Sequence, residues 1–249
     1  MRKSILGLSA LSLLAVSAPV LAQDEAESAS PITITGSVGL VSDYRFRGFA
    51  QSSENAAIQG GITVEHESGF YAGTWGSSVT FAGGAEVDLF AGYSKEVAPG
   101  VTADVGLLYY LYPKHGGGAT DFFEPYVNVT GAIGPATLQV GVNYAWAQEA
   151  LESLKDGSKA SAFYVHAEPS IAIPNTPFTL EGHVGYAVSD AFPGGGGNDH
   201  HVWDYSIGAS VAYRNLSFGI HYVDTDEARS RANIEGSDGA VIFSLTASF

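Results

Sequence analysis

The chain contains no cysteine, and its only methionine is Met1. Without cysteine it can form no disulfide framework and has no thiol nucleophile. Basic residues are also scarce, since 11 lysines and arginines stand against 26 aspartates and glutamates in 249 residues, for a formal charge of −15. Proteins that bind nucleic acid need a basic surface, so this balance argues against a nucleic-acid partner.

The N-terminal apolar run is too short for a membrane-spanning helix, which needs roughly 20 residues. Arg2 and Lys3 precede an apolar core at 5–16, and Val20-Leu21-Ala22 supplies a cleavage pattern of small residues. We therefore predict a secretory signal peptide cleaved near Ala22, with a retained anchor as the alternative. Cleavage would remove two of the 11 basic residues and no acidic one, which leaves a formal charge of −17.

Helical periodicity is also missing. From Ile32 onward the only helix candidate is 147–155, and elsewhere apolar and polar residues alternate with the period of two that strands require. We predict twelve strands, at 32–47, 56–66, 70–79, 85–96, 101–112, 121–133, 136–147, 161–173, 178–189, 202–214, 216–224 and 238–249. The chain then divides into a signal peptide (1–22), a short acidic periplasmic leader (23–31) and one β-domain (32–249).

The connections between these strands alternate strictly between long and short. The short ones are 67–69, 98–100, 134–135, 174–177 and 215, and the long ones are 48–55, 80–84, 113–120, 148–160, 190–201 and 225–237. Outer-membrane barrels have short periplasmic turns and long extracellular loops, whereas a soluble β-sandwich has no reason to sort its loops in this way. The fold class is therefore predicted to be all-β, a transmembrane antiparallel β-barrel of about twelve strands. Counts of ten or fourteen are the alternatives.

One face of each predicted strand is apolar. In the fourth strand this face holds Val87, Leu89, Ala91 and Tyr93. A soluble sandwich core would give the same alternation. Aromatic residues gather near the outer strand ends (Tyr109, Tyr144, Trp146, Tyr186, Trp203, Tyr222) and near the periplasmic ends (Tyr71, Tyr93, Phe178, Tyr213, Phe249). Two aromatic girdles around an aliphatic band are typical of a membrane barrel.

The stretch 41–75 shows the two faces together. We assign Leu40, Tyr44, Phe46, Ile58, Ile62, Val64, Tyr71 and Trp75 to the lipid face. Asp43, Arg45, Arg47, Gln59, Thr63, Glu65 and Thr74 then point into the lumen. A sheet with one apolar and one charged face needs a different solvent on each side, which here means lipid outside and water inside.

The same stretch carries a family resemblance. Its motifs are S-D-Y-R-F-R-G at 42–48, Gln51-Ser52, Q-G-G at 59–61 and H-x-S-G-F-Y-x-G-x-W at 66–75. They resemble the TorF family, a group of proteobacterial outer-membrane proteins of uncharacterised function that are classed as porins. The resemblance implies a barrel in the outer membrane. It brings neither a known substrate nor catalytic residues.

The C-terminus ends in V-I-F-S-L-T-A-S-F, with apolar residues alternating up to Phe249. This resembles the signature by which outer-membrane barrels are recognised for assembly. We therefore expect the barrel-assembly machinery, through Phe249, and outer-membrane lipid as partners, with small solutes as cargo. The expected location is the outer membrane of a Gram-negative cell.

The inward positions collect charged and polar side chains. They are Asp43, Arg45, Arg47, Glu65, Glu86, Asp88, Asp104, Tyr110, Glu124, Tyr126, Tyr164, His166, Glu168, Glu181, His183, Asp204 and His221. These side chains either solvate or plug a wet interior, or they line a pore and select solutes. Acids outnumber arginines, and rings of carboxylates favour cations. We predict a porin-like channel for passive diffusion of small hydrophilic solutes with a preference for cations; a non-conducting structural or adhesive barrel is the alternative.

An enzyme is the weaker hypothesis. His166 and Glu168, like Glu181 and His183, lie two apart on one strand face, about 7 Å from each other, which is too far for the direct contact of a catalytic triad. Pairing across strands could still assemble one. The chain has no nucleophile elbow. The loop clusters at 198–201 and 224–227 hold aspartate, glutamate and histidine, but their spacing matches no strong metal site. We expect no catalytic residue, metal or cofactor.

Overall fold

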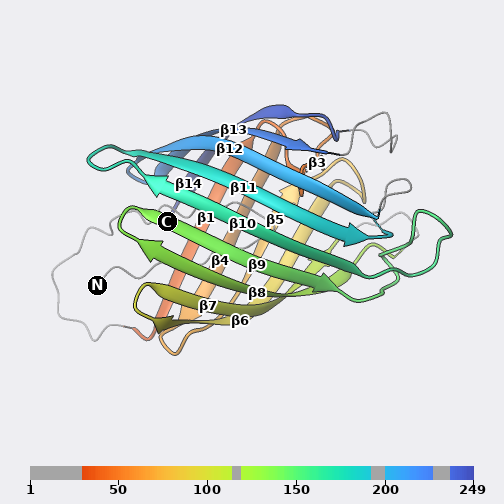
Figure 1. The fold of residues 1–249 in the computed structure, drawn as a ribbon, viewed down its shortest axis with the longest axis horizontal. Helices are drawn as coiled ribbons and strands as arrows, with labels where there is room; N and C mark the ends of the chain where they lie inside the picture. Colours follow the sequence, from red (N-terminus) through yellow and green to blue (C-terminus); the bar gives the residue numbers. More distant parts are fainter. Residues whose placement is uncertain (1–29, 114–118, 192–199, 227–235) are drawn as a thin grey trace.

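Twelve antiparallel strands close into one barrel (Figure 1). The computed structural model describes residues 30–113, 119–191, 200–226 and 236–249, so the predicted signal peptide and most of the leader lie outside it. The barrel strands are β1 (Ile32–Val41), β4 (Ala57–His66), β5 (Phe70–Ser78), β6 (Ala85–Ala98), β7 (Val101–Leu111), β8 (Phe122–Ile133), β9 (Ala136–Ala145), β10 (Ala162–Ala172), β11 (Phe178–Ser189), β12 (His201–Tyr213), β13 (Leu216–Thr225) and β14 (Ala240–Ser248). The prediction of a twelve-stranded barrel is confirmed.

Strand β1 closes the ring, because it pairs with β4 on one side and β14 on the other. The β1–β14 ladder holds five residue pairs, from Ser37↔Ser248 to Val41↔Ser244. Backbone hydrogen bonds between Gly36 and Phe249 extend it at one end. Closure leaves no open sheet edge, which is what a hydrocarbon environment requires.

The predicted alternation of connections is confirmed. The turns 67–69, 99–100, 134–135, 173–177 and 214–215 gather at one barrel end, and the long connections lie at the other (Figure 1). Three of the short turns contain glycine in the left-handed region, at Gly69, Gly100 and Gly134 (φ of 106°, 75° and 60°). Glycine tolerates this conformation without strain, so such turns reverse the chain within very few residues.

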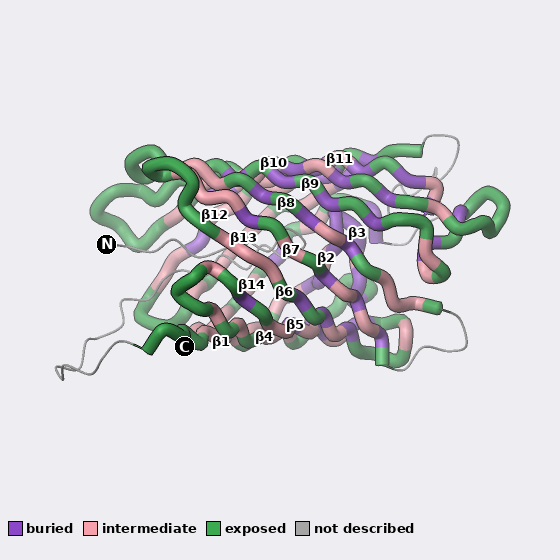
Figure 2. Tube along the Cα trace, turned by 90° about the horizontal axis from the view of Figure 1, so that it is seen from below, coloured by how far each residue is buried: buried purple, intermediate pink, exposed green. Residues whose placement is uncertain are grey.

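Large apolar side chains cover the outside of the barrel. Figure 2 shows exposed and buried residues alternating along the strands. Ile207 is 71% exposed and Val105 is 52% exposed, although both lie mid-strand. A water-soluble surface rarely carries a continuous apolar band of this kind, so lipid is the solvent that fits it. Exposed aromatics flank the band, among them Trp203 near the loops and Phe178 near the turns.

The described residues contain no helix long and apolar enough to cross a membrane. The helix candidate at 147–155 folds instead as turns, with a bridge between Glu152 and Lys159.

The first predicted strand requires a correction. It ends at Val41, and residues 42–56, here called the plug, fold into the barrel. Within the plug a small hairpin joins β2 (Arg45–Phe46) to β3 (Phe49–Ala50). Arg47 and Gly48 both have positive φ, 48° and 84°, and two such residues make the tight turn that suits a hairpin. The chain therefore turns back where the alternation predicted a continuing strand.

Four residues assigned to the lipid face lie inside instead. Tyr44 and Phe46 are buried because they belong to the plug. Tyr71 and Trp75 of β5 are buried inside the barrel, so the outward positions of this strand are Phe70, Ala72, Thr74 and Gly76. Thr74, which was predicted to point into the lumen, therefore lies on the outer face. Residues 70–76 are largely apolar on both faces, so alternation alone could not choose between them.

Candidate functional site

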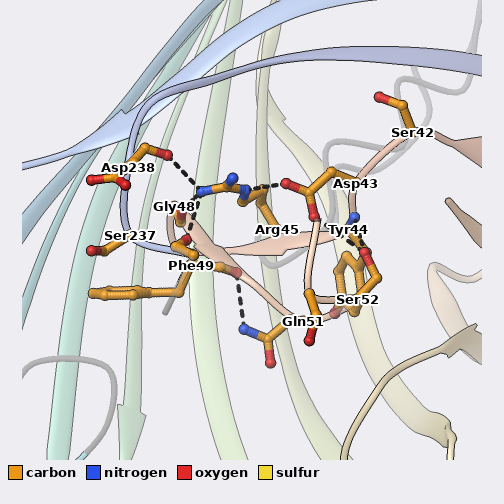
Figure 3. Close-up of polar contacts among 12 residues, drawn as sticks. Ser42, Asp43, Tyr44, Arg45, Gly48, Phe49, Gln51, Ser52, Ser237 and Asp238 are labelled. Atoms are coloured by element: carbon orange, nitrogen blue, oxygen red, sulfur yellow. Dashed lines mark hydrogen bonds and ion pairs between the residues drawn. The ribbon is translucent and has the colours of Figure 1, made fainter. Parts of the chain in front are cut away.

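The plug is held to the loop end of the barrel by Arg45 (Figure 3). Its Nε donates to Asp43 Oδ2 at 2.5 Å, and Nη1 donates to the carbonyl oxygens of Gly48, Gly236 and Asp238 at 3.0, 2.7 and 2.9 Å. Gly236 and Asp238 belong to the connection before β14. One guanidinium therefore ties the plug to itself and to that connection.

A second set of bonds shapes the plug internally. The Ser52 hydroxyl accepts a bond from the Tyr44 amide at 2.9 Å and donates to the Asn55 carbonyl at 2.6 Å. The backbone amide of Gln51 donates to the backbone carbonyl of Tyr44 at 2.7 Å, and the backbone carbonyl of Gln51 accepts from the backbone amide of Thr80 at 3.0 Å. The S-D-Y-R-F-R-G motif and the Gln51-Ser52 pair are thus the parts of one folded insert.

Arg47 anchors the plug to the barrel wall. Its Nη2 donates to Glu124 Oε1 on β8 at 2.6 Å, and its guanidinium carbon lies 4.0 Å from the ring centre of Tyr164 on β10. The other Glu124 oxygen accepts bonds from the Tyr110 hydroxyl and the Asn143 amide, each at 3.1 Å. Both charges are almost fully buried, so this pair depends on its mutual contact.

Tyr44 anchors the plug to β6. Its hydroxyl donates to Glu86 Oε1 at 2.7 Å, while Tyr112 donates to Glu86 Oε2 at the same distance. Burial, helped by the neighbouring Glu86 carboxylate, raises the pKa of the Tyr44 phenol well above its usual range, so the hydroxyl remains a donor. Asp88 lies buried close by and makes no hydrogen bond to the residues that the structure describes.

The half of the lumen beside β4 to β8 is filled by a buried cluster of mostly aromatic side chains. Its members are Tyr44, Phe46, Ala57, Tyr71, Trp75, Val79, Phe90, Leu108, Tyr110, Tyr112 and Tyr126. Tyr44 packs on Trp75 with ring centres 5.6 Å apart, and Phe46 packs on Tyr110 at 5.8 Å. The apolar side of the plug thus completes a core inside the barrel, and this half is closed.

The other half holds a cavity of about 200 Å³ between the plug and the wall formed by β10 to β14 and β1. Small inward residues, among them Ser37, Gly39, Ser206, Ser244 and Thr246, leave this space open. Asp43, Arg45 and Arg47 line it from the plug, and Tyr164, Glu168, His183, Asp204 and His221 line it from the wall. Among the described residues, this cavity is open space in the lumen with charged groups in its lining.

A network of histidine, tyrosine and carboxylate forms the cavity wall. His183 Nε2 lies 2.7 Å from Asp204 Oδ1, and the Tyr164 hydroxyl donates to Asp204 Oδ2 at 3.0 Å. His183 Nδ1 lies 3.6 Å from Glu168 Oε1. His166 Nδ1 is 3.3 Å from the same oxygen, an ion-pair distance without hydrogen-bond geometry. This corrects the expectation that strand spacing keeps His166 and Glu168 about 7 Å apart. The rings of Tyr164, His166 and His183 stack along the wall.

A second pair lies farther along the wall. His221 Nε2 is 2.6 Å from Glu181 Oε2, and the Ser210 hydroxyl donates to Glu181 Oε1 at 2.6 Å. The carboxylate therefore lies between the hydroxyl and the imidazole. Nucleophilic catalysis needs the imidazole itself on the hydroxyl, so this trio has the wrong order.

The structure divides the predicted lumen residues into two groups. Eight line the cavity: Asp43, Arg45, Arg47, Tyr164, Glu168, His183, Asp204 and His221. Glu86, Asp88, Asp104, Tyr110, Glu124, Tyr126, His166 and Glu181 are buried by other side chains, and Glu65 lies partly buried opposite Tyr71. Sequence reasoning did not single out the buried Asn128 and Asn143, although alternation places both inside, and it assigned the buried Trp75 to the lipid face. A pore-lining role remains a prediction.

The loop clusters suggested as alternative metal sites carry other contacts. Asp224 Oδ2 accepts bonds from the hydroxyls of Tyr205 and Tyr222, and Asp226 accepts one from the Trp203 amide. Residues 198, 199 and 227 lie outside the described ranges. Within those ranges no group of three histidine or acidic side chains is arranged to hold a metal ion.

Comparison with known proteins gives a family and a fold. A family model described as "Bacterial protein of unknown function (Gcw_chp)" matches residues 25–249. No curated protein matches the chain. The TorF name that the motifs suggested is not among these findings.

Several solved structures share the fold. The NanC porin aligns with a TM-score of 0.60 at 13% identity, over 87% of this chain and 99% of the porin. The KdgM porin gives 0.54 at 8% identity, over 87% and 98%. An outer membrane channel from Pseudomonas putida F1 gives 0.54 at 8% identity, over 90% and 99%. At such identities the likeness establishes the porin-type barrel and no more.

Proposed function

Because this chain belongs to the Gcw_chp family of bacterial proteins of unknown function and folds as a porin-type barrel, we propose that it is an outer-membrane channel for small hydrophilic solutes. The observation that carries the proposal is the cavity between the plug and the wall of β10 to β14, whose lining includes charged side chains from both. A purely structural barrel of this size could fill its whole interior with side chains. Here one half is filled and the other is lined with serine, glycine and charged groups.

The channel is narrow and prefers cations. The plug and the aromatic cluster leave only the cavity side for passage. Asp43, Glu168 and Asp204 supply three negative charges to the cavity lining, against two positive charges from Arg45 and Arg47. Both arginines are engaged with carboxylates, at 2.5 and 2.6 Å. The wall carboxylates therefore set the field that a passing ion meets in this low-dielectric passage.

Planar-bilayer conductance of the refolded protein tests the proposal. We expect small ohmic steps at low salt, with reversal potentials in a KCl gradient that show cation preference. The preference should weaken at high ionic strength because salt screens the lumen charges. Selectivity for anions would show that the arginines dominate the field, and absence of conductance would exclude the channel.

The second candidate is a non-conducting structural or adhesive barrel. The bonds of the plug favour this second candidate. Arg45 bonds the connection before β14, Arg47 bonds β8 and Tyr44 bonds β6, so the plug is held at three places. Swelling of protein-loaded liposomes in sugars of increasing size separates the two candidates. A channel admits the small sugars at a rate that falls with size, whereas a sealed barrel admits none.

The proposed location and assembly partner rest on the C-terminal strand. The backbone of Phe249 bonds to Gly36 in both directions, at 2.8 and 2.9 Å, while its side chain is 74% exposed. The terminal ring lies over Gly36 at the barrel seam and remains exposed, so assembly machinery and lipid can reach it. Replacing Phe249 by serine should lower outer-membrane insertion in cells but leave refolding in detergent intact. Equal insertion of both proteins would overturn the assignment.

A further inference from the structure

We propose that Glu168 binds cations on their way through the cavity and is the residue that sets the cation preference of the channel. This inference deepens the proposed channel function and rests on it. The ligand class is a small cation, namely an alkali ion or a primary ammonium group, for which a carboxylate oxygen is a suitable partner. Glu168 differs from the other carboxylates around the cavity in its exposure and in its bonds.

The exposure of Glu168 is the first difference. Its side chain lines the cavity from β10 and is 23% exposed. Among the described residues, four other carboxylates line the cavity or pair with an arginine or histidine that does. Their side chains are at most 7% exposed, and they are Asp43 (7%), Glu124 (1%), Glu181 (7%) and Asp204 (4%). A cation in the cavity therefore touches Glu168 directly but meets the other four charges only through intervening atoms.

The bonds of Glu168 are the second difference. Both oxygens of each of the other four carboxylates have a partner within 3.1 Å, from an arginine, a histidine, a hydroxyl or an amide. Glu168 Oε1 instead lies 3.3 Å from His166 Nδ1 and 3.6 Å from His183 Nδ1, and Oε2 accepts from the Gln139 side-chain amide at 3.5 Å. Within the described ranges Glu168 has no closer partner, so its oxygens can still accept a strong contact.

The negative charge of Glu168 also remains largely unbalanced. His183 lies between two carboxylates, but Asp204 at 2.7 Å is nearer than Glu168 at 3.6 Å. A proton on this imidazole is therefore shared mainly with Asp204, because Coulomb attraction and hydrogen bonding both strengthen at the shorter distance. His166 lies at 3.3 Å without hydrogen-bond geometry, and each plug arginine is paired with another carboxylate. Glu168 thus presents a negative charge to the cavity.

The size of the effect depends on distance. A unit charge about 4 Å from an ion raises cations and lowers anions about sixfold each in a water-like dielectric, which changes their ratio roughly thirtyfold. At about 8 Å the ratio changes only about fivefold. We therefore expect Glu168→Gln to lower the ratio of K⁺ to Cl⁻ permeability by roughly tenfold or more at low ionic strength. Asp204→Asn should lower it by less than about fivefold, because the Asp204 charge is buried and balanced by His183.

The experiment measures KCl reversal potentials of the full-length mature protein at low ionic strength and about pH 8, where carboxylates are ionised. The test variants Glu168→Gln and Asp204→Asn each remove one charge and keep the size of the side chain. Glu67→Gln is the matched control, because Glu67 is exposed in a periplasmic turn. Heat-modifiable migration confirms that each variant is folded.

Restoring a charge at the same position separates a cation contact from structural damage. The chain has no native cysteine, so Glu168→Cys carries a single thiol. A methanethiosulfonate reagent that attaches a sulfonate there should restore the cation preference, whereas one that attaches a trimethylammonium group should shift the preference toward anions. The thiol of Asp204→Cys should react much more slowly, because Asp204 is only 3% exposed.

We expect the unmodified protein and Glu67→Gln to share one cation-preferring ratio, and Glu168→Gln to have the lowest ratio. An unchanged ratio in Glu168→Gln, equal losses in Glu168→Gln and Asp204→Asn, or a Glu168→Cys ratio that neither reagent alters overturns the inference while the channel stands. Absence of conductance in the unmodified protein instead overturns the proposed function, and the inference with it.

Discussion

Releasing the plug is the perturbation that bears most directly on how the lumen is closed. Arg47→Met removes the guanidinium that bonds Glu124 at 2.6 Å and lies over Tyr164, and leaves an apolar side chain of similar length. Removing one partner of a buried ion pair costs about 3–5 kcal/mol, because the other charge stays buried. Tyr110 and Asn143 still donate to Glu124, so we expect the lower end of that range.

A loss of about 3 kcal/mol multiplies the undocked fraction of the plug by roughly a hundred. The barrel itself should persist, since its ladders do not involve the plug. We therefore expect larger and noisier conductance steps from Arg47→Met. Charge-neutral removal of both partners, in Arg47→Met with Glu124→Gln, should restore part of the closure, because no unpaired charge is left inside.

The absence of native cysteine provides a second assay. Ala50→Cys places one thiol on β3 of the plug, half-buried and next to Gly236. A charged thiol reagent should modify it much faster in the Arg47→Met background. Arg214→Met is the matched control, since Arg214 stacks on Tyr213 at a periplasmic turn. Labelling rates and conductance equal to those of the unmodified protein would refute the anchoring role of Arg47.

Three further outcomes follow from the same geometry. Ile207→Arg, mid-strand on the lipid face, should lower the unfolding free energy in lipid by about 2–4 kcal/mol. The neighbouring Ser206→Arg should lower it much less, because Ser206 points into the cavity. Equal urea midpoints for the two variants would contradict the assignment of Ile207 to the outside and Ser206 to the inside. Gly48→Val should undock the plug tip, since Gly48 has positive φ and a side-chain carbon there would clash with Thr225; unchanged conductance would contradict this. Tyr44→Phe should loosen the plug by about 1–3 kcal/mol through the lost bond to Glu86, measured by labelling of Ala50→Cys, and unaltered labelling would count against it.

The sequence predicts the barrel because two independent patterns agree. The order of loop lengths gives the topology, and period-two alternation gives the facing of strands such as β7, where Val105 lies outside and Asp104 inside. Each pattern is local, and the closed sheet only repeats it. Strand bounds differ from the prediction by a few residues, except in the first strand.

The plug could not be predicted from alternation, because a hairpin inside a barrel has the same alternation of side chains as a strand of the barrel wall. Asp43 to Arg47 alternates charged and aromatic side chains, and nothing in that pattern says where the ladder ends. The local signal was Arg47-Gly48, a turn that needs two positive φ values. Arginine is not a usual residue for such a turn, so the signal is weak without the buried contacts that impose it.

The division of the lumen into a filled and an open half depends on the volumes of the inward side chains. The alternation of polar and apolar residues contains no information about these volumes. Inward positions of β5 to β8 carry Trp75, Phe90 and Tyr126, whereas those of β12 and β14 carry Ser206 and Ser244. Charge signs alone suggested one wet lumen lined by all the inward acids. Once side-chain size is included, Glu86 and Glu124 beside the aromatic cluster hold the plug, and Glu168 and Asp204 near the small residues line the cavity.

The same plug therefore serves both halves of the lumen. Its aromatic side chains, Tyr44 and Phe46, complete the aromatic cluster. Its arginines form ion pairs that neutralise Asp43 and Glu124. Glu168 and Asp204, with His183 between them, then remain as the charged groups of the cavity wall. If the barrel conducts, its selectivity should therefore depend on Glu168 and Asp204 rather than on the two arginines, because each arginine already lies against a carboxylate at 2.5 or 2.6 Å.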